Sequence, residues 1–140
     1  MLRTQLLHPT ILQALAGAGH GSTVLIADGN YPLSTKTNPQ AARVYLNLRP
    51  GLVSVTEILA TILTAIPVEA AHVMQTADGS EPEIYAEFRQ QLPTLSLTPV
   101  ERFAFYERAR QHDLALAILS GDQRLYANIL LTIGVIPPHQ

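Results

Sequence analysis

The sequence has no cysteine, no tryptophan, a single lysine and few charged residues of either sign. The absence of cysteine excludes disulfides, thiol catalysis and thiolate metal sites. With Lys36 alone and a net charge of −2, the chain lacks the basic surface that nucleic-acid binding requires. No apolar run reaches the roughly 18 residues of a membrane-spanning helix, and the N-terminus lacks a signal-peptide layout. We therefore expect a cytoplasmic protein without nucleic-acid or membrane partners.

The shortage of charge has a second consequence. Charged residues make up 14% of the 140 residues and hydrophobic ones 47%, whereas about 25% of a typical domain is charged. A chain of this length folds as one domain and buries roughly two-thirds of its surface. The remaining surface is large, and few charges are available to cover it. This composition favours a homo-oligomer in which some of that surface meets other subunits.

Strand and helix signals alternate along the chain without a linker or a repeat. Apolar, β-branched runs predict strands at 23–27, 43–48, 70–75, 94–97, 114–119 and 127–133. Helices are predicted at 11–16, 55–66, 84–91 and 99–112, the last three opened by capping-box pairs: Ser54 with Glu57, Ser80 with Glu83, and Thr98 with Glu101. This alternation predicts a single compact α/β domain over residues 1–140, with a mostly parallel central sheet flanked by helices.

Two polar residues flank the first predicted strand. Asp28 follows its carboxyl end, where ligands gather in open α/β sheets, although an Asx-type turn would explain this residue equally well. His20 lies between Gly19 and Gly21 before the strand, and a lone loop histidine is often only solvated. The strand would hold the two residues near opposite ends, unless the glycines fold His20 back or a second subunit completes a site.

A polar and aromatic segment over 102–109 stands out near the C-terminal half. Arg102 and Tyr106 are four residues apart and share a helix face, and the two donors beside an aromatic ring suit a neutral polyol. The alternative is an amphipathic helix whose aromatic side chains pack inward. Tyr126 and Asn128 again pair a phenol with an amide at the start of the last predicted strand.

No pattern predicts a cofactor. The histidines are His8, His20, His72, His112 and His139, and they show neither the i, i+4 pairing nor the carboxylate spacing of zinc or iron sites. Gly17, Gly19 and Gly21 precede a strand, whereas a phosphate-binding loop follows one and opens a helix. A nucleotide-binding α/β protein is therefore disfavoured.

Four motifs, in order, resemble the ribose pyranase and fucose mutarotase family (RbsD/FucU). They are Gly19-His20-Gly21, Asp28 followed by Tyr31-Pro32, the run from Arg102 to Ala109, and Tyr126-Ala127-Asn128 before Gly134-Val135. The resemblance extends over nearly the whole chain, and the run at 102–109 is closer to the fucose branch.

The resemblance implies a cofactor-independent isomerase that interconverts the anomers of a free monosaccharide such as L-fucose. It implies an oligomeric ring, often a decamer, with sites at subunit contacts. Carried over by position, His20 is the proton donor, and the residues that bind sugar hydroxyls are Asp28, Arg102, Tyr106, Tyr126 and Asn128.

Two departures leave the sugar open. Asn30 stands where fucose-type members usually carry histidine, and Ala127 stands where they usually carry glycine, as in ribose-type members. D-ribose pyranase activity is therefore an alternative. A non-catalytic sugar-binding module that partners a transporter or kinase is another, as is a purely structural oligomer.

Overall fold

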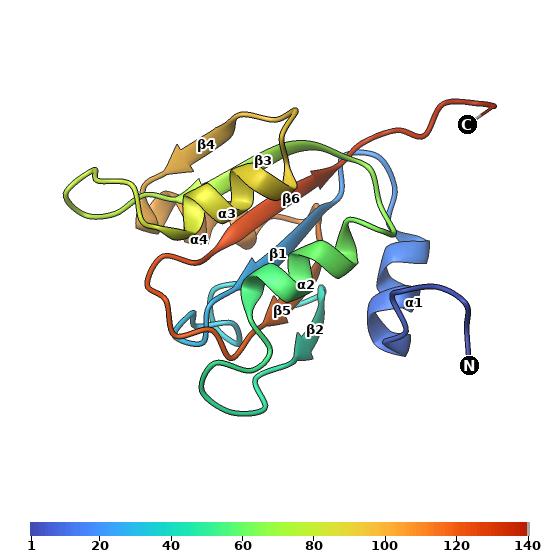
Figure 1. Ribbon diagram of the computed structural model, residues 1–140, viewed down its shortest axis with the longest axis horizontal. Helices are drawn as coiled ribbons and strands as arrows, with labels where there is room; N and C mark the ends of the chain where they lie inside the picture. The colour runs from blue at the N-terminus through green and yellow to red at the C-terminus, as the bar shows by residue number, and fades with distance from the viewer. Residues whose placement is uncertain (140) are drawn as a thin grey trace.

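Six strands form one sheet in the order β2-β5-β1-β6-β3-β4 (Figure 1). The computed structural model describes residues 1–139, so of the expected domain only Gln140 lies outside the described residues. The strands are β1 Thr23–Ala27, β2 Ala42–Tyr45, β3 Val68–Met74, β4 Leu97–Val100, β5 Leu114–Leu119 and β6 Ile129–Ile133. The helices are α1 Pro9–Gly17, α2 Val55–Ile62, α3 Ile84–Gln91 and α4 Arg102–Ala109.

Parallel pairing dominates the sheet. The pairs β2–β5, β5–β1 and β3–β4 are parallel, and β6 runs antiparallel between β1 and β3. The predicted α/β class with a mostly parallel sheet is confirmed. Because β6 is antiparallel, the residues that precede it lie at the end of the sheet where β1 ends.

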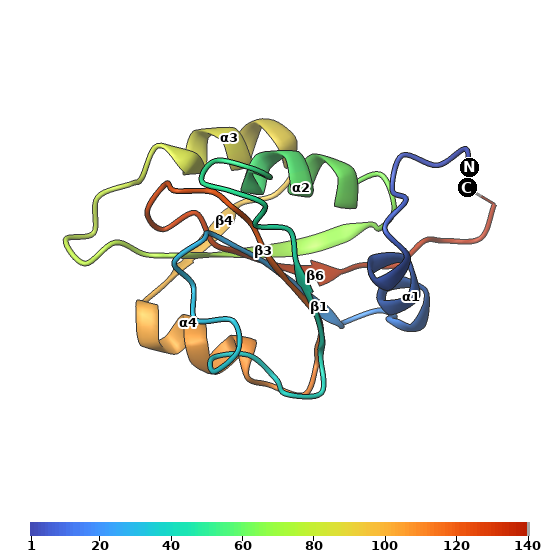
Figure 2. The ribbon, with the colours of Figure 1, turned by 90° about the horizontal axis from the view of Figure 1, so that it is seen from below.

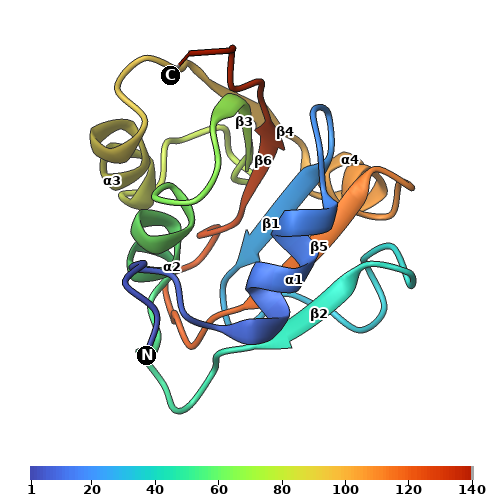
Figure 3. The same cartoon turned by 90° about the vertical axis from the view of Figure 1, so that its right-hand side faces the viewer.

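Helices cover both faces of the sheet (Figure 2). Val24 and Ile26 of β1 face the core under α1, α2 and α3, whereas Leu25 and Ala27 face the core under α4. α1 packs against β2 and β5 (Figure 3). All five residues of β1 are buried, as expected for a central strand covered on both sides. Among the described residues, no helix is long and apolar enough to cross a membrane.

One of the three predicted capping boxes forms. The Ser54 hydroxyl accepts the Glu57 N–H at 3.2 Å, and the Glu57 carboxylate accepts the Ser54 N–H at 3.3 Å. The Ser80 box is wrong: its hydroxyl donates instead to Asp78 Oδ1 at 2.6 Å within a turn.

The Thr98 box is also wrong, because Thr98 and Pro99 continue β4. β4 lies at the edge of the sheet, where a proline removes no pairing that the strand needs. α4 therefore begins at Arg102 and is capped by Glu101, whose carboxylate accepts the N–H groups of Phe103 and Ala104 at 3.0 Å. The strand predicted at 94–97 consequently starts three residues later than expected.

Candidate functional site

Two residues that are 100 positions apart meet where β1 ends and β6 begins. Asn128 Oδ1 accepts the backbone N–H of Asp28 at 2.8 Å, and Asn128 Nδ2 donates to Asp28 Oδ2 at 3.2 Å. Because β6 is antiparallel to β1, the end of β1 and the start of β6 lie side by side at the same end of the sheet. Both side chains are buried.

The Asp28 carboxyl is buried and accepts hydrogen bonds from two neighbouring residues. Its Oδ1 accepts the N–H of Asn30 at 2.9 Å, which is the predicted Asx-type turn. Burial raises the pKa of Asp28, and the hydrogen bonds from Asn30 and Asn128 only partly oppose this effect. Asp28 thus forms the turn and also lines a cavity, so the turn does not exclude a ligand-binding role for this residue.

Helix α4 contributes two polar groups to the site, the guanidinium of Arg102 and the phenol of Tyr106. Arg102 Nε donates to Tyr106 Oη at 3.2 Å, as their spacing of four residues predicts. This bond raises the pKa of Arg102. Tyr106 packs edge-on against Tyr31, with 5.3 Å between ring centroids, while Phe105 points into the core. Of the three aromatic residues of this helix, Phe105 lies in the core, Tyr106 lies at the site and Phe103 is exposed.

The loop after β5 carries Tyr126 and is fixed at several points. The Asp122 carboxylate accepts N–H groups from Arg124 at 2.9 and 2.7 Å and the N–H of Val55 at 3.0 Å, and Arg124 also bonds Glu87 on α3. A Cβ on Gly121 would clash with the Leu52 carbonyl oxygen, so only glycine fits there. Tyr126 has a φ of 61°, a conformation that few non-glycine residues adopt.

The ends of β1 and β6, helix α4 and the loop that carries Tyr126 surround one open cavity of about 230 Å³. Its walls are Asp28, Asn30, Tyr31, Met74, Arg102, Tyr106, Leu125, Tyr126 and Asn128. The structure brings together five of the six side chains predicted from the sequence. The other four lining residues, which were not among the predicted site residues, are Asn30, Tyr31, Met74 and Leu125. Met74 has the pattern of a core residue and is indeed buried. For Tyr31, the available signal was its position three residues after Asp28 in the same turn.

His20 is not in this cavity. It precedes β1, which at about 3.3 Å per residue spans roughly 16 Å, so His20 and Asp28 lie near opposite ends of the strand. Gly21 N–H donates to the Ile133 carbonyl at 3.0 Å, which places the His20 turn beside the end of β6. The glycines do not fold His20 back. Instead, its Nε2 lies 3.0 Å from both carboxylate oxygens of Glu69, a residue that sequence reasoning missed.

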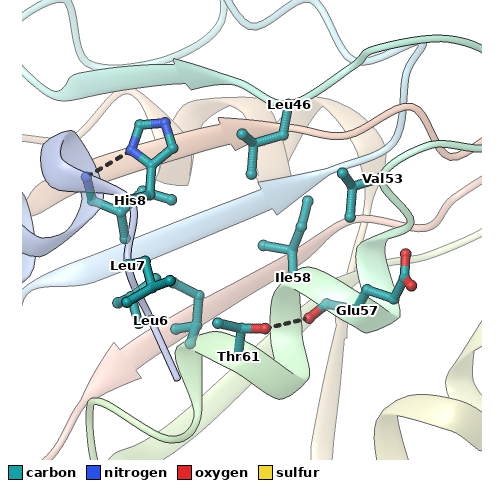
Figure 4. A pocket seen from close by; sticks show the side chains of 10 residues that line it. Leu6, Leu7, His8, Leu46, Val53, Glu57, Ile58 and Thr61 are labelled. Atoms are coloured by element: carbon teal, nitrogen blue, oxygen red, sulfur yellow. Dashed lines mark hydrogen bonds between the residues drawn. The ribbon is translucent and has the colours of Figure 1, made fainter. Parts of the chain in front are cut away.

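A second hollow, of about 270 Å³, lies between the N-terminal segment and α2 (Figure 4). Leucine, isoleucine and valine side chains form most of its wall, and His8 turns its Nδ1 toward the N–H of Ile11 at 3.4 Å. It offers a small molecule few converging polar groups. In the part of the chain that the structure describes, no group of three or more His, Asp or Glu side chains is placed to hold a metal ion.

Comparison with known proteins gives a consistent result. A model of the "RbsD / FucU transport protein family" matches residues 1–136. The chain is 34% identical over 150 residues to a fucose mutarotase from Danio rerio, which covers 96% of this chain and 92% of that protein.

Solved structures agree with this match. A fucose mutarotase from Streptococcus pneumoniae in complex with L-fucose superposes with a TM-score of 0.83 at 26% identity, over 98% of this chain and 100% of that one. RbsD from Bacillus subtilis complexed with D-ribose superposes with a TM-score of 0.85 over the same shares at 22% identity, which shows a shared fold.

Proposed function

The chain belongs to the RbsD / FucU transport protein family, and from this premise we propose that it is a sugar mutarotase. It would interconvert the anomers of a free monosaccharide such as L-fucose. The observation that carries the proposal is the convergence of Asp28, Arg102, Tyr106, Tyr126 and Asn128 on one cavity. Its volume of about 230 Å³ is somewhat below the roughly 300–1,000 Å³ of pockets for drug-sized ligands, which suits a ligand as small as a monosaccharide.

The chemistry of the cavity suits a neutral sugar. Arg102 and the phenols of Tyr106 and Tyr126 donate hydrogen bonds, and the Asp28 carboxyl is an acceptor that burial keeps away from water. Asn128 serves mainly to hold Asp28, and the Tyr106 ring gives the sugar an apolar surface. The neighbouring charges of Asp28 and Arg102 are opposite, so the pocket has no strong preference for a charged ligand.

His20 would be the proton donor, supplied by a second subunit. Within one chain it lies near the far end of β1 from the cavity, so it reaches a sugar there only from a neighbouring copy. The cavity rim supports such a contact, since Leu125 and the nearby Phe103 expose 67% and 64% of their surface. A homo-oligomer, such as the decameric ring that the family resemblance implies, would bury these apolar side chains and account for the low surface charge.

The proposed reaction breaks and remakes one bond. The His20 imidazolium donates a proton to the ring oxygen while the bond from the anomeric carbon to that oxygen breaks, and solvent takes up the anomeric hydroxyl proton. Rotation of the aldehyde and the reverse transfer close the ring as the other anomer, and no co-reactant is consumed. Positioned acid–base transfer supplies about 10²–10⁴-fold, or roughly 3–5 kcal/mol.

Two other functions are possible alternatives to anomer exchange of a sugar such as L-fucose. Ala127 beside the cavity is the feature shared with ribose-type members, so D-ribose ring-form exchange is the second candidate reaction. A non-catalytic sugar-binding module would use the same pocket without accelerating exchange.

Two-dimensional exchange NMR on L-fucose and D-ribose distinguishes these three candidate functions. We expect the wild-type protein to accelerate anomer exchange of one sugar and His20→Ala to lose that acceleration, while His112→Ala, an exposed histidine, serves as the matched control. Sugar binding without acceleration by any form of the protein would favour the binding module. An active His20→Ala protein would overturn the assignment of His20.

Mixed oligomers test the second-subunit contribution. We would co-express His20→Ala and Arg102→Ala chains, each inactive alone. If each site combines His20 from one chain with Arg102 from another, about a quarter of the sites are intact in a random equal mixture. No recovered activity, or a fully active monomer, would contradict an intersubunit site.

A further inference from the structure

The pairing of His20 with Glu69 joins two segments at the amino end of β1. Both carboxylate oxygens of Glu69 lie 3.0 Å from His20 Nε2, and each of the two side chains is about half exposed. The pair lies outside the sugar cavity, and within residues 1–139 no other charged residue forms an ion pair with either member.

The backbone directs both side chains toward each other. Val68 pairs with Ile133 and Ala70 with Thr132, so Glu69 is the extra residue of a β-bulge. A bulge re-aims a side chain out of the regular alternation, and bulges are common beside active sites. On the other side, the Gly19 and Gly21 turn fixes His20, because Gly21 has a φ of 86° and donates its N–H to the Ile133 carbonyl.

Gly134 leaves room for the carboxylate. A Cβ at this position would lie 3.4 Å from Glu69 Cβ and 3.7 Å from Glu69 Oε2, which is ordinary contact for alanine. Gly134 of the Gly134-Val135 motif therefore lies directly beside the Glu69 side chain that reaches His20.

On the basis of the proposed function, we propose that Glu69 is a positioning residue for proton transfer by His20. A carboxylate that accepts from one imidazole nitrogen fixes the tautomer and the ring orientation. With Nε2–H directed at Glu69, the neutral ring presents its Nδ1 lone pair outward, toward the neighbouring copy. Nδ1 is then the atom that exchanges a proton with the sugar.

An ordinary surface ion pair would not need this construction. Glu81 with Arg89, and Glu107 with Arg110, are also exposed pairs, and both use flexible side chains on or beside a helix. Exposed pairs of this kind contribute little to stability. The bulge at Glu69 and the glycine turn at His20 together restrict the pair in a way that stability does not require.

The test compares Glu69→Leu, which removes the acceptor, with Glu69→Gln, which keeps an oxygen acceptor but not the charge. Nitrogen-15 NMR of histidine-labelled protein at about pH 8.5, where imidazole is neutral, reports the tautomer. The His20 signals are those missing from His20→Ala. We expect the two wild-type His20 nitrogens to be well separated in shift, to move toward each other in Glu69→Leu, and to stay near the wild-type values in Glu69→Gln.

The same variants are measured for sugar exchange. Loss of orientation should lower kcat about 10- to 100-fold in Glu69→Leu with KM little changed, because Glu69 does not touch the sugar. Glu69→Gln should recover most of the loss. Glu81→Leu breaks an exposed pair elsewhere and should change neither the His20 signals nor the rate.

The outcomes separate the two proposals. If the wild-type protein accelerates exchange and Glu69→Leu matches it in rate and in His20 shifts, the role of Glu69 is overturned and the mutarotase proposal stands. If Glu69→Gln is as impaired as Glu69→Leu, positioning through a hydrogen bond is wrong. If the wild-type protein accelerates nothing, the proposed function fails, and the catalytic purpose of Glu69 fails with it.

Discussion

Asn128 holds Asp28 at two points, by accepting its backbone N–H at 2.8 Å and by donating to its carboxylate at 3.2 Å. One amide side chain thereby fixes both the end of β1 and the direction of the buried carboxyl. The contact ties the end of β1 to the start of β6 and fixes two residues that line the cavity, so the fold and the proposed function depend on the same two bonds.

Asn128→Leu keeps the side-chain size but removes both bonds. Since Asp28 N–H and its carboxylate would stay buried without this partner, we expect a loss of about 1–3 kcal/mol in the free energy of unfolding. Urea titration should show a lower midpoint with an unchanged slope. Asn47→Leu, at an exposed asparagine, is the control. Equal midpoints for the two variants would show that the two hydrogen bonds between Asn128 and Asp28 contribute nothing to stability.

The buried Asp28 carboxyl predicts a pH dependence of stability. Burial raises its folded-state pKa above the unfolded value near 3.8, so the folded state binds more protons between these two values. This contribution is fully present below pH 3.8 and is lost as pH rises through the folded pKa. Wild type should therefore lose stability relative to Asp28→Asn as pH rises through this window, as measured by urea midpoints at several pH values. A difference that stays constant with pH would contradict the raised pKa.

Arg124 supports the loop that carries Tyr126. Burial opposes ionisation of Asp122, but the hydrogen bonds from Arg124 and Val55 outweigh it and lower the pKa of Asp122. Removing the guanidinium in Arg124→Met leaves a carboxylate of 4% exposure poorly compensated. We expect the free energy of unfolding to fall by about 1–3 kcal/mol. The loss should lie toward the lower end of this range, because Arg124 is itself partly exposed.

The pH dependence of this loss gives a second check. A lowered pKa contributes stability above the unfolded value of about 3.8, and that contribution disappears as pH falls through the folded pKa. The difference in the free energy of unfolding between wild type and Arg124→Met should therefore become smaller below about pH 4. Arg110→Met, which breaks an exposed pair with Glu107, should cost less than about 1 kcal/mol. An Arg124→Met protein as stable as this control would refute the role of Arg124.

Tyr126→Phe tests the phenol without changing the ring or the backbone. If its hydroxyl donates to a sugar, the loss of one neutral hydrogen bond weakens sugar binding roughly three- to tenfold. Tyr45→Phe alters an exposed tyrosine on β2, away from the cavity, and should bind normally. Calorimetric titration with the responsive sugar measures both. Unchanged affinity in Tyr126→Phe would remove Tyr126 from the sugar contacts, while unfolding midpoints confirm that both variants fold.

Local pattern was sufficient where a segment's own chemistry decided its structure. The buried runs at 23–27 and 114–119 form strands with those bounds, and the Ser54 capping box opens α2 as predicted. Thr98 illustrates the limit: its capping spacing was correct, but pairing with β3 drew it into an edge strand. Main-chain pairing across the sheet is a non-local gain that a short sequence window does not contain.

Sequence patterns alone were enough to predict the α/β class, the family resemblance and five of the residues that line the cavity. How these residues meet depends on long-range packing. The antiparallel insertion of β6 places Asn128 on Asp28, and the bulge at Glu69 turns a carboxylate onto His20. Both arrangements depend on strand order and register, which are set by packing between distant segments and leave no local signature in the chain.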